Sequence, residues 1–137
     1  PASCAGNEAC HQHYRSFVRP EVDRLAAWFS QPEYADKPLI MSEIGVCALW
    51  GCHDYGRAQW SEEFQSDYFA EACHAILQNS RYAGLSLWQM LDTKTYVNHG
   101  PIRGKPRGMN CAGLVDEYRR PKLAFQTVAS LYRKKWL

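Results

Sequence analysis

One carboxylate stands near the end of an otherwise apolar stretch of the chain, KPLIMSEIG, residues 37–45. Residues 39–41 predict a strand buried on both faces, Glu43 follows two residues later, and Gly45 ends the run. A buried charge is costly unless it has partners. A carboxylate at the carboxyl end of a parallel strand is also where α/β enzymes place their chemistry. Glu43 is therefore a candidate catalytic group, with a hydrogen-bonded or ion-paired structural glutamate as the alternative.

The amino-acid composition is typical of a globular domain. The 137 residues suffice for one domain, and 46% hydrophobic with 22% charged residues argues against disorder. A net charge of +2 is too small to indicate nucleic acid as a partner. No run of residues reaches membrane-spanning length, and the opening residues lack the regions of a signal peptide. We expect neither nucleic acid nor a membrane as partner, and the compartment stays open.

The six cysteines include no C-x-x-C pair and no zinc-finger spacing. Cys47 with Cys52 and His53 is the nearest thing to a ligand cluster, and it lacks a second half at regular spacing. Closed zinc sites normally show paired ligands, so we expect no metal site. Most of the cysteines are expected to be buried free thiols. The sequence implies no cofactor.

Three helices are predicted. After a loop-like start at residues 1–12, apolar residues at helical spacing predict a helix over residues 14–30. Ser61 is a credible N-cap for a second helix that ends near Gln78. Pro121 is expected to open the last helix, because proline is favoured at the first helical position.

Two strands are predicted, at residues 39–44 and 84–91, and both are nearly all apolar rather than alternating. Such runs are typical of a parallel sheet covered by helices, so we predict an α/β fold. Two or three βα units neither close a barrel nor cover both faces of a sheet. The chain is therefore expected to be part of a larger fold or to pair with something. A loop of about twenty residues follows the second strand, which favours a functional role for that loop.

Four blocks of sequence, in order and close to the expected spacing, resemble the C-terminal end of the catalytic barrel of glycoside hydrolase family 2. These blocks are KPLIMSEIG, WGCHDYGRAQWSEEF, GLSLWQMLD and NCAGLVDEYRRPKLAF. The family includes β-galactosidases and β-glucuronidases. The resemblance extends over residues 13–137 and implies the last two βα units of a (β/α)₈ TIM barrel, plus the helix before them. It implies that Glu43 is the nucleophile of a retaining β-glycosidase, whose second carboxylic acid lies about 5 Å away.

The second acid is not expected in this chain. Asn7-Glu8 resembles the family's Asn-Glu pair, but that pair lies three βα units before the nucleophile. At about 30 residues per unit, the separation should be near 90 residues. Glu43 follows Glu8 by only 35 positions. We therefore expect Glu8 to be a loop or helix-start residue, the acid/base to lie outside this chain, and the chain alone to be inactive.

The resemblance also implies residues that bind the sugar. Trp88 matches a tryptophan that floors the sugar subsite, although a core tryptophan is the alternative. Loop residues after the nucleophile are expected to rim the pocket, and polar residues late in the chain to reach hydroxyls. The substrate-binding residues expected are Trp88, Asp92, His53, Trp50 and Asn110.

The sugar is predicted from one departure from the family pattern. In its glucuronidases the lysine of an Asn-x-Lys pair grips the sugar carboxylate, whereas this chain has Asn110, Cys111 and Ala112. Lys105 or Arg107 could substitute from the same loop. A neutral sugar, as in a β-galactosidase, is favoured, and other β-linked sugars remain open.

The alternative to a catalytic role is a non-catalytic barrel remnant or partner subunit that binds sugar or serves as a scaffold. The partners expected are a carbohydrate and the remaining part of the barrel, in the same or another chain.

Overall fold

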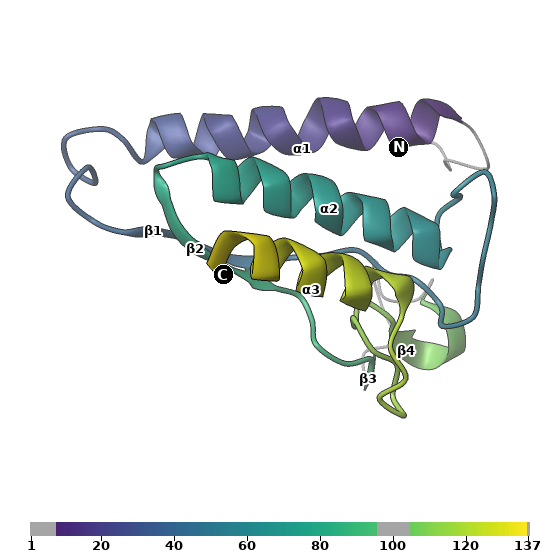
Figure 1. Ribbon diagram of the computed structural model, residues 1–137. Helices are drawn as coiled ribbons and strands as arrows, with labels where there is room; N and C mark the ends of the chain where they lie inside the picture. Colours follow the sequence, from purple (N-terminus) through teal and green to yellow (C-terminus); the bar gives the residue numbers. More distant parts are fainter. Residues whose placement is uncertain (1–7, 96–104, 137) are drawn as a thin grey trace.

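The computed structural model describes the backbone of residues 8–95 and 105–136 and the side chains of residues 17–95 and 105–133. Three helices lie side by side, with α2 between α1 and α3, next to a pair of parallel strands (Figure 1). The elements in order are α1 (Glu8–Trp28), β1 (Leu39–Ile44), α2 (Glu62–Gln78), β2 (Tyr82–Leu87), β3 (Thr93–Lys94), η2 (Pro106–Gly108), β4 (Met109–Asn110) and α3 (Leu123–Trp136). The predicted order of helices and main strands is confirmed.

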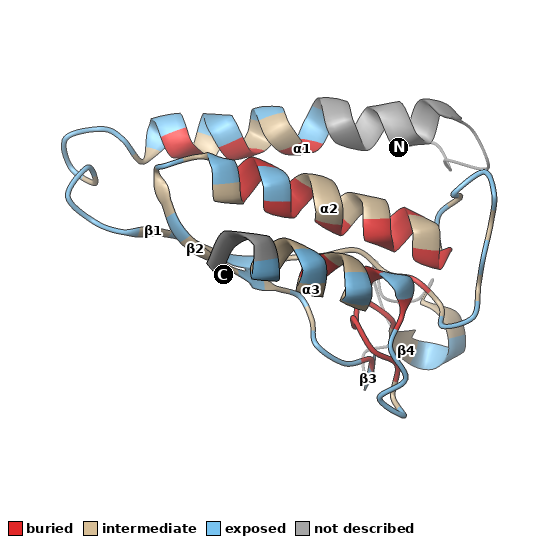
Figure 2. Ribbon diagram, viewed as in Figure 1, coloured by how far each residue is buried: buried red, intermediate tan, exposed pale blue. Residues whose placement is uncertain are grey.

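Two buried clusters form the core, and both contain residues of α2. The first joins α1 to α2, the second joins α2 to α3, and side chains of β1 and β2 pack against them. Figure 2 shows buried residues along the sides of the helices that face one another. The buried members are Val18, Val22, Ala72, Ala75 and Ile76 in the first cluster, and Phe69, Cys73, Leu114, Ala124 and Val128 in the second. Because β2 contributes to both clusters, the three helices cover the same face of the strands.

The first helix starts earlier than predicted. It begins at Glu8, so the expectation of a loop over residues 1–12 and a start at residue 14 was wrong for the described part. The opening turns are polar and lack the apolar spacing that predicts a helix. Pro20 consequently lies inside the helix rather than near its start. Glu8 itself is the first residue of α1, which confirms the prediction of a helix-start position.

The second helix has the predicted boundaries, and the third does not. The Phe64 amide donates to Ser61 Oγ at 3.2 Å, which confirms the predicted N-cap of α2. The third helix begins at Leu123, two residues after the predicted Pro121. Pro121 instead forms a β-bridge with Val115. Among the described helices, none is long and apolar enough to cross a membrane.

β1 and β2 pair in parallel, as their continuous apolar runs predict, so the α/β class is confirmed. β2 ends at Leu87 rather than at residue 91. From Gln89 onward the chain bonds to residues 112–115 instead of β1: the Gln89 amide donates to the carbonyl oxygen of Ala112 at 3.1 Å. The described sheets are two-stranded pairs, β1–β2 and β3–β4, so they do not establish a (β/α)₈ barrel.

Candidate active site

A bulge in β1 places Glu43. Met41 pairs with Leu85 and Ile44 pairs with Leu87, so three steps along β1 match two steps along β2. Both Met41 and Ile44 pack against the helical core. The extra residue between them leaves Glu43 exposed, away from the face that the helices cover. Bulges are over-represented next to active sites because they re-aim a side chain.

The Glu43 carboxylate has no ion-pair or hydrogen-bond partner among the residues that the structure describes. A structural glutamate at the end of a core strand would need such a partner to offset the loss of hydration. The described part of the chain therefore gives no support to the structural alternative. The role of Glu43 as a nucleophile stays a prediction.

Gly45 brings the end of β1 against Trp88. A Cβ atom at Gly45 would lie 1.7 Å from the carbonyl oxygen of Trp88, so no side chain fits there. The Trp88 amide also donates to the carbonyl oxygen of Ile44 at 2.8 Å, and the Trp88–Gln89 peptide is cis. Trp88 is 43% exposed as a residue, so the described residues do not enclose it as they would a core tryptophan.

Asp92 lies in a buried ion pair with Lys122. The two residues are 5% and 1% exposed, and Asp92 Oδ1 lies 2.8 Å from Lys122 Nζ. The Lys122 ammonium also donates to the carbonyl oxygens of Ala48 at 2.7 Å and Cys111 at 2.9 Å. Burial raises the pKa of Asp92, although the Lys122 ammonium opposes that shift. The pair thus joins the segments that follow β1, β2 and β4, and contact of Asp92 with a sugar hydroxyl stays a prediction.

Sequence reasoning missed Lys122. A lysine directly before the first residue of a helix is unfavourable next to the helix dipole, and that position was the available signal for a buried partner. Gln65 was missed as well: its Nε2 donates to the carbonyl oxygens of Val46 at 2.9 Å and Gly113 at 3.1 Å. Gln65 therefore connects α2 to the segments that follow β1 and β4.

Two adjacent glutamates of α2 hold the loop that contains Trp50 and His53. Glu62 accepts from the backbone amides of Gly51 and Leu123, both at 2.6 Å, and so fixes this loop to the start of α3. His53 Nδ1 lies 2.7 Å from Glu63 Oε1. The Glu63 carboxylate raises the pKa of His53, whose side chain is 61% exposed. His53 is thus a surface residue of the loop in the described chain, and its contact with substrate is untested.

Trp50 stacks on an arginine. The guanidinium carbon of Arg120 lies 3.6 Å from the centre of the Trp50 ring, a cation–π contact, and Arg120 also pairs with Asp116 at 2.5 Å. The arginine covers one face of the ring. A sugar stacked on Trp50 would therefore need the other face, and that contact stays a prediction.

Asn110 lies where three segments meet. Its Oδ1 accepts from Lys105 Nζ at 2.9 Å and lies 3.7 Å from Cys47 Sγ, in the loop that follows β1. Its carbonyl oxygen lies 3.4 Å from Gln89 Nε2, just beyond β2. Asn110 is thus beside the carboxyl ends of both parallel strands, near the segment that carries Glu43.

The described cysteines are free thiols. Cys73 and Cys111 are buried, and burial raises the pKa of each to about 11. Cys47 and Cys52 are half-buried. The remaining two, Cys4 and Cys10, lie outside the residues whose side chains are described. Within the described residues, no three His, Cys, Asp or Glu side chains form a group that could hold a metal ion.

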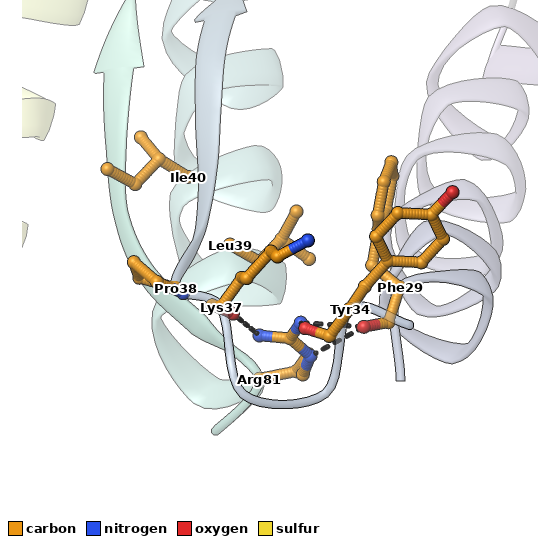
Figure 3. A pocket seen from close by; sticks show the side chains of 7 residues that line it. All are labelled: Phe29, Tyr34, Lys37, Pro38, Leu39, Ile40 and Arg81. Atoms are coloured by element: carbon orange, nitrogen blue, oxygen red, sulfur yellow. Dashed lines mark hydrogen bonds between the residues drawn. The ribbon is translucent and has the colours of Figure 1, made fainter. Parts of the chain in front are cut away.

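A hollow of about 360 Å³ lies at the amino ends of β1 and β2, the end opposite Glu43 (Figure 3). The Arg81 guanidinium donates to the backbone carbonyl oxygens of Phe29, Tyr34 and Lys37 beside it, at 2.6 to 3.2 Å. Arg81 therefore anchors the turn that leads into β1. In parallel α/β folds the functional groups lie at the carboxyl ends of the strands, so we do not assign the candidate active site to this hollow.

Comparison with known proteins shows that the chain is similar to segments of glycoside hydrolases. No family model matches it. The chain is 29% identical over 114 residues to a β-glucuronidase of Streptococcus agalactiae, covering 82% of the chain and 17% of that protein. It is 34% identical over 91 residues to the β-glucuronidase of Rattus norvegicus, covering 64% of the chain and 13% of that protein.

Solved structures of related enzymes are also similar to the chain, in sequence and in fold. A GH2 β-galacturonidase from Eisenbergiella tayi bound to galacturonate is 36% identical with a TM-score of 0.78, over 85% of the chain and 21% of that protein. A Faecalibacterium prausnitzii β-glucuronidase has the same fold, with a TM-score of 0.74 over 88% of the chain and 19% of that protein. The chain is thus similar to a segment of these β-glycosidases. The resemblance to glycoside hydrolase family 2 is confirmed, and the chain spans about a fifth or less of the length of these relatives.

Proposed function

We propose that the chain is the C-terminal part of the (β/α)₈ catalytic barrel of a retaining β-glycosidase and carries its nucleophile, Glu43. The observation that carries this proposal is a carboxylate exposed by a bulge at the carboxyl end of β1, with no partner in the described part of the chain. Two parallel strands covered on one face by helices are the arrangement expected of neighbouring βα units.

In this proposal Glu43 attacks the anomeric carbon, and a glycosyl–enzyme ester forms as the bond to the leaving oxygen breaks. A second carboxylic acid protonates that oxygen, then deprotonates the water that hydrolyses the ester. Trp88 presents its exposed ring to the apolar face of the pyranose. The buried Asp92–Lys122 pair and the Glu62 contacts hold the surrounding loops, so the site needs little reorganisation when substrate binds.

The acid/base residue is proposed to belong to the remaining part of the barrel, in the same or another chain. Apolar side chains that are exposed here support this: Ile40 and Met90 are each 58% exposed. Exposed apolar groups on strands and strand ends are what a barrel interior presents when its other strands are absent. On this proposal the chain alone is inactive.

The proposal leaves open which β-linked sugar is the substrate. The missing lysine after Asn110 favours a neutral β-galactoside, whereas the relatives are a β-galacturonidase and β-glucuronidases. Both classes are β-glycosides, and the nucleophilic role of Glu43 is the same for each.

Glu43→Gln tests the proposal in the full-length protein that contains this segment. The amide keeps the shape of the side chain but cannot attack, so turnover of aryl β-glycosides should fall to a small residual fraction. Glu33→Gln is the matched control, because Glu33 is exposed in the turn before β1, at the other end of the strand. Wild-type turnover by Glu43→Gln would favour the alternative of a non-catalytic remnant or scaffold.

A further inference from the structure

An exposed stack of aromatic rings and a guanidinium lies in the segments that follow β1 and β4. The guanidinium carbon of Arg120 lies 3.6 Å from the centre of the Trp50 ring and 5.3 Å from the centre of the Tyr118 ring. Trp50 is 43% exposed and Tyr118 is 73% exposed. Arg120 covers one face of Trp50, so the opposite face is the one that can take a ligand.

The backbone holds Trp50 in place on both sides. The Leu49 amide donates to the carbonyl oxygen of Trp60 at 2.9 Å. The Gly51 amide donates to Glu62 Oε1 at 2.6 Å, and this carboxylate belongs to α2. A ring whose chain is fixed before and after it loses little freedom when a ligand stacks on it, so the cost of binding there is low.

The charge of Arg120 is balanced inside the protein. Asp116 is 1% exposed, and its Oδ2 lies 2.5 Å from Arg120 Nη2 and accepts from Arg120 Nε at 2.6 Å. The third nitrogen, Nη1, has no hydrogen-bond partner among the described residues. A guanidinium already paired with a carboxylate, but with N–H donors left over, favours neutral hydroxyl groups over a second anion.

The stack is at the same end of the strands as Glu43, but it is farther from that residue along the chain than the contact made by Trp88. The Trp88 amide donates to the carbonyl oxygen of Ile44, directly after Glu43. Trp50 follows Glu43 by seven positions, in the loop after β1, and Figure 1 shows this loop and the segment before α3 toward the carboxyl ends of β1 and β2. If Trp88 carries the sugar that is attacked, Trp50 is placed for the group that leaves.

We propose that Trp50 and Arg120 form a subsite for the leaving group, and that this group is a neutral sugar, so the substrate is an oligosaccharide. The inference rests on the proposed function. A pyranose has an apolar C–H face, which suits the free face of Trp50, and a rim of hydroxyls, which suits the donors of Arg120.

The test uses the full-length protein and substrates that differ only in the leaving group. Galactose, galacturonic acid and glucuronic acid are each supplied as the β-fluoride, as the p-nitrophenyl β-glycoside and as the disaccharide β-linked to O4 of glucose, and the sugar that is turned over fastest is used. Trp50→Leu should lower kcat/KM for the disaccharide by about 10- to 100-fold, a range taken from aromatic stacking on nucleobases. It should leave kcat/KM for the fluoride unchanged, because fluoride has no ring to stack.

Two further variants separate stacking from folding. Trp50→Phe keeps a flat ring and should retain most of the activity on the disaccharide. Tyr55→Ala is the matched control: it removes a fully exposed aromatic ring from the same loop and should change none of the three rates. An equal loss for all three substrates in Trp50→Leu would mean that Trp50 packs against the rest of the protein, and would overturn the subsite. A greater loss for the p-nitrophenyl glycoside than for the disaccharide would overturn the assignment to a sugar.

A trapped ester gives a second readout. In the proposed mechanism a glucose hydroxyl can replace water: its oxygen bonds to the anomeric carbon, the ester bond to Glu43 breaks, and the hydroxyl proton passes to the acid/base carboxylate. Added glucose should therefore speed the loss of a 2-deoxy-2-fluoro glycosyl ester from the wild type, with saturation, and should do so much less in Trp50→Leu. An ester that forms but does not respond to glucose would overturn the subsite and leave the proposed function standing. Absence of turnover with every one of these compounds would overturn the proposed function itself.

Discussion

On the proposed function, Gly45→Ala should damage catalysis by the full-length protein without touching a catalytic group. The added Cβ would lie 1.7 Å from the carbonyl oxygen of Trp88, so about 1.3 Å of movement is needed to reach even the 3.0 Å limit of real contacts. That oxygen belongs to the backbone, so the ends of β1 and β2 must separate. They carry Glu43 and Trp88, and a displacement of about 1 Å can cost about 100-fold in rate.

Gly84→Ala is the matched control, because a Cβ at this position of β2 meets nothing within 4 Å. We expect kcat/KM for the best aryl β-glycoside to fall by about 100-fold in Gly45→Ala and to stay near wild type in Gly84→Ala. Circular dichroism should show that both variants remain folded. A Gly45→Ala enzyme with wild-type kcat/KM would refute the reasoning that this contact aligns the site.

Three further predictions follow from the same contacts. Lys122→Met should destabilise the enzyme by about 3–5 kcal/mol, because it leaves the Asp92 carboxylate buried without its cation; a melting temperature equal to wild type would contradict this. The pKa of Asp92, already raised by burial, should rise further, so the loss should be smallest at acid pH, where this carboxyl is protonated, and should grow as pH rises through that pKa. Trp88→Ala should cost about 1–3 kcal/mol in transition-state binding, a range taken from aromatic stacking on nucleobases, whereas unchanged kcat/KM with a lower melting temperature would favour a packing role. The 137-residue chain alone should hydrolyse no aryl β-glycoside and should bind a hydrophobic dye; enzymatic turnover by it would place an acid/base within the chain.

The elements that could be predicted from the sequence are those whose signals are local. The strand at β1 and the N-cap at Ser61 each depend on a few adjacent residues, and both are confirmed. The predicted burial of this strand on both faces was wrong for the described chain, because the helices cover one face and Ile40 on the other is 58% exposed. The start of α1 was missed because its first turns are polar. Pro121 was misplaced because a β-bridge to Val115 outweighs its preference for the first helical position.

The parts of the site that could not be predicted depend on contacts between distant residues. Lys122 meets Asp92 across 30 positions, and Glu62 caps α3 across 61 positions. No pattern in a single sequence reports such pairs. The stacking of Arg120 on Trp50 is another contact of this kind.

Covalent labelling tests the central claim most directly. An activated 2-deoxy-2-fluoro β-glycoside of the preferred sugar should trap the glycosyl–enzyme ester in the full-length protein, because the fluorine slows breakdown of the ester. We predict that peptide mapping finds one labelled residue within the chain described here, Glu43, and that Glu43→Gln takes up no label. A label on any other carboxylate would contradict the account.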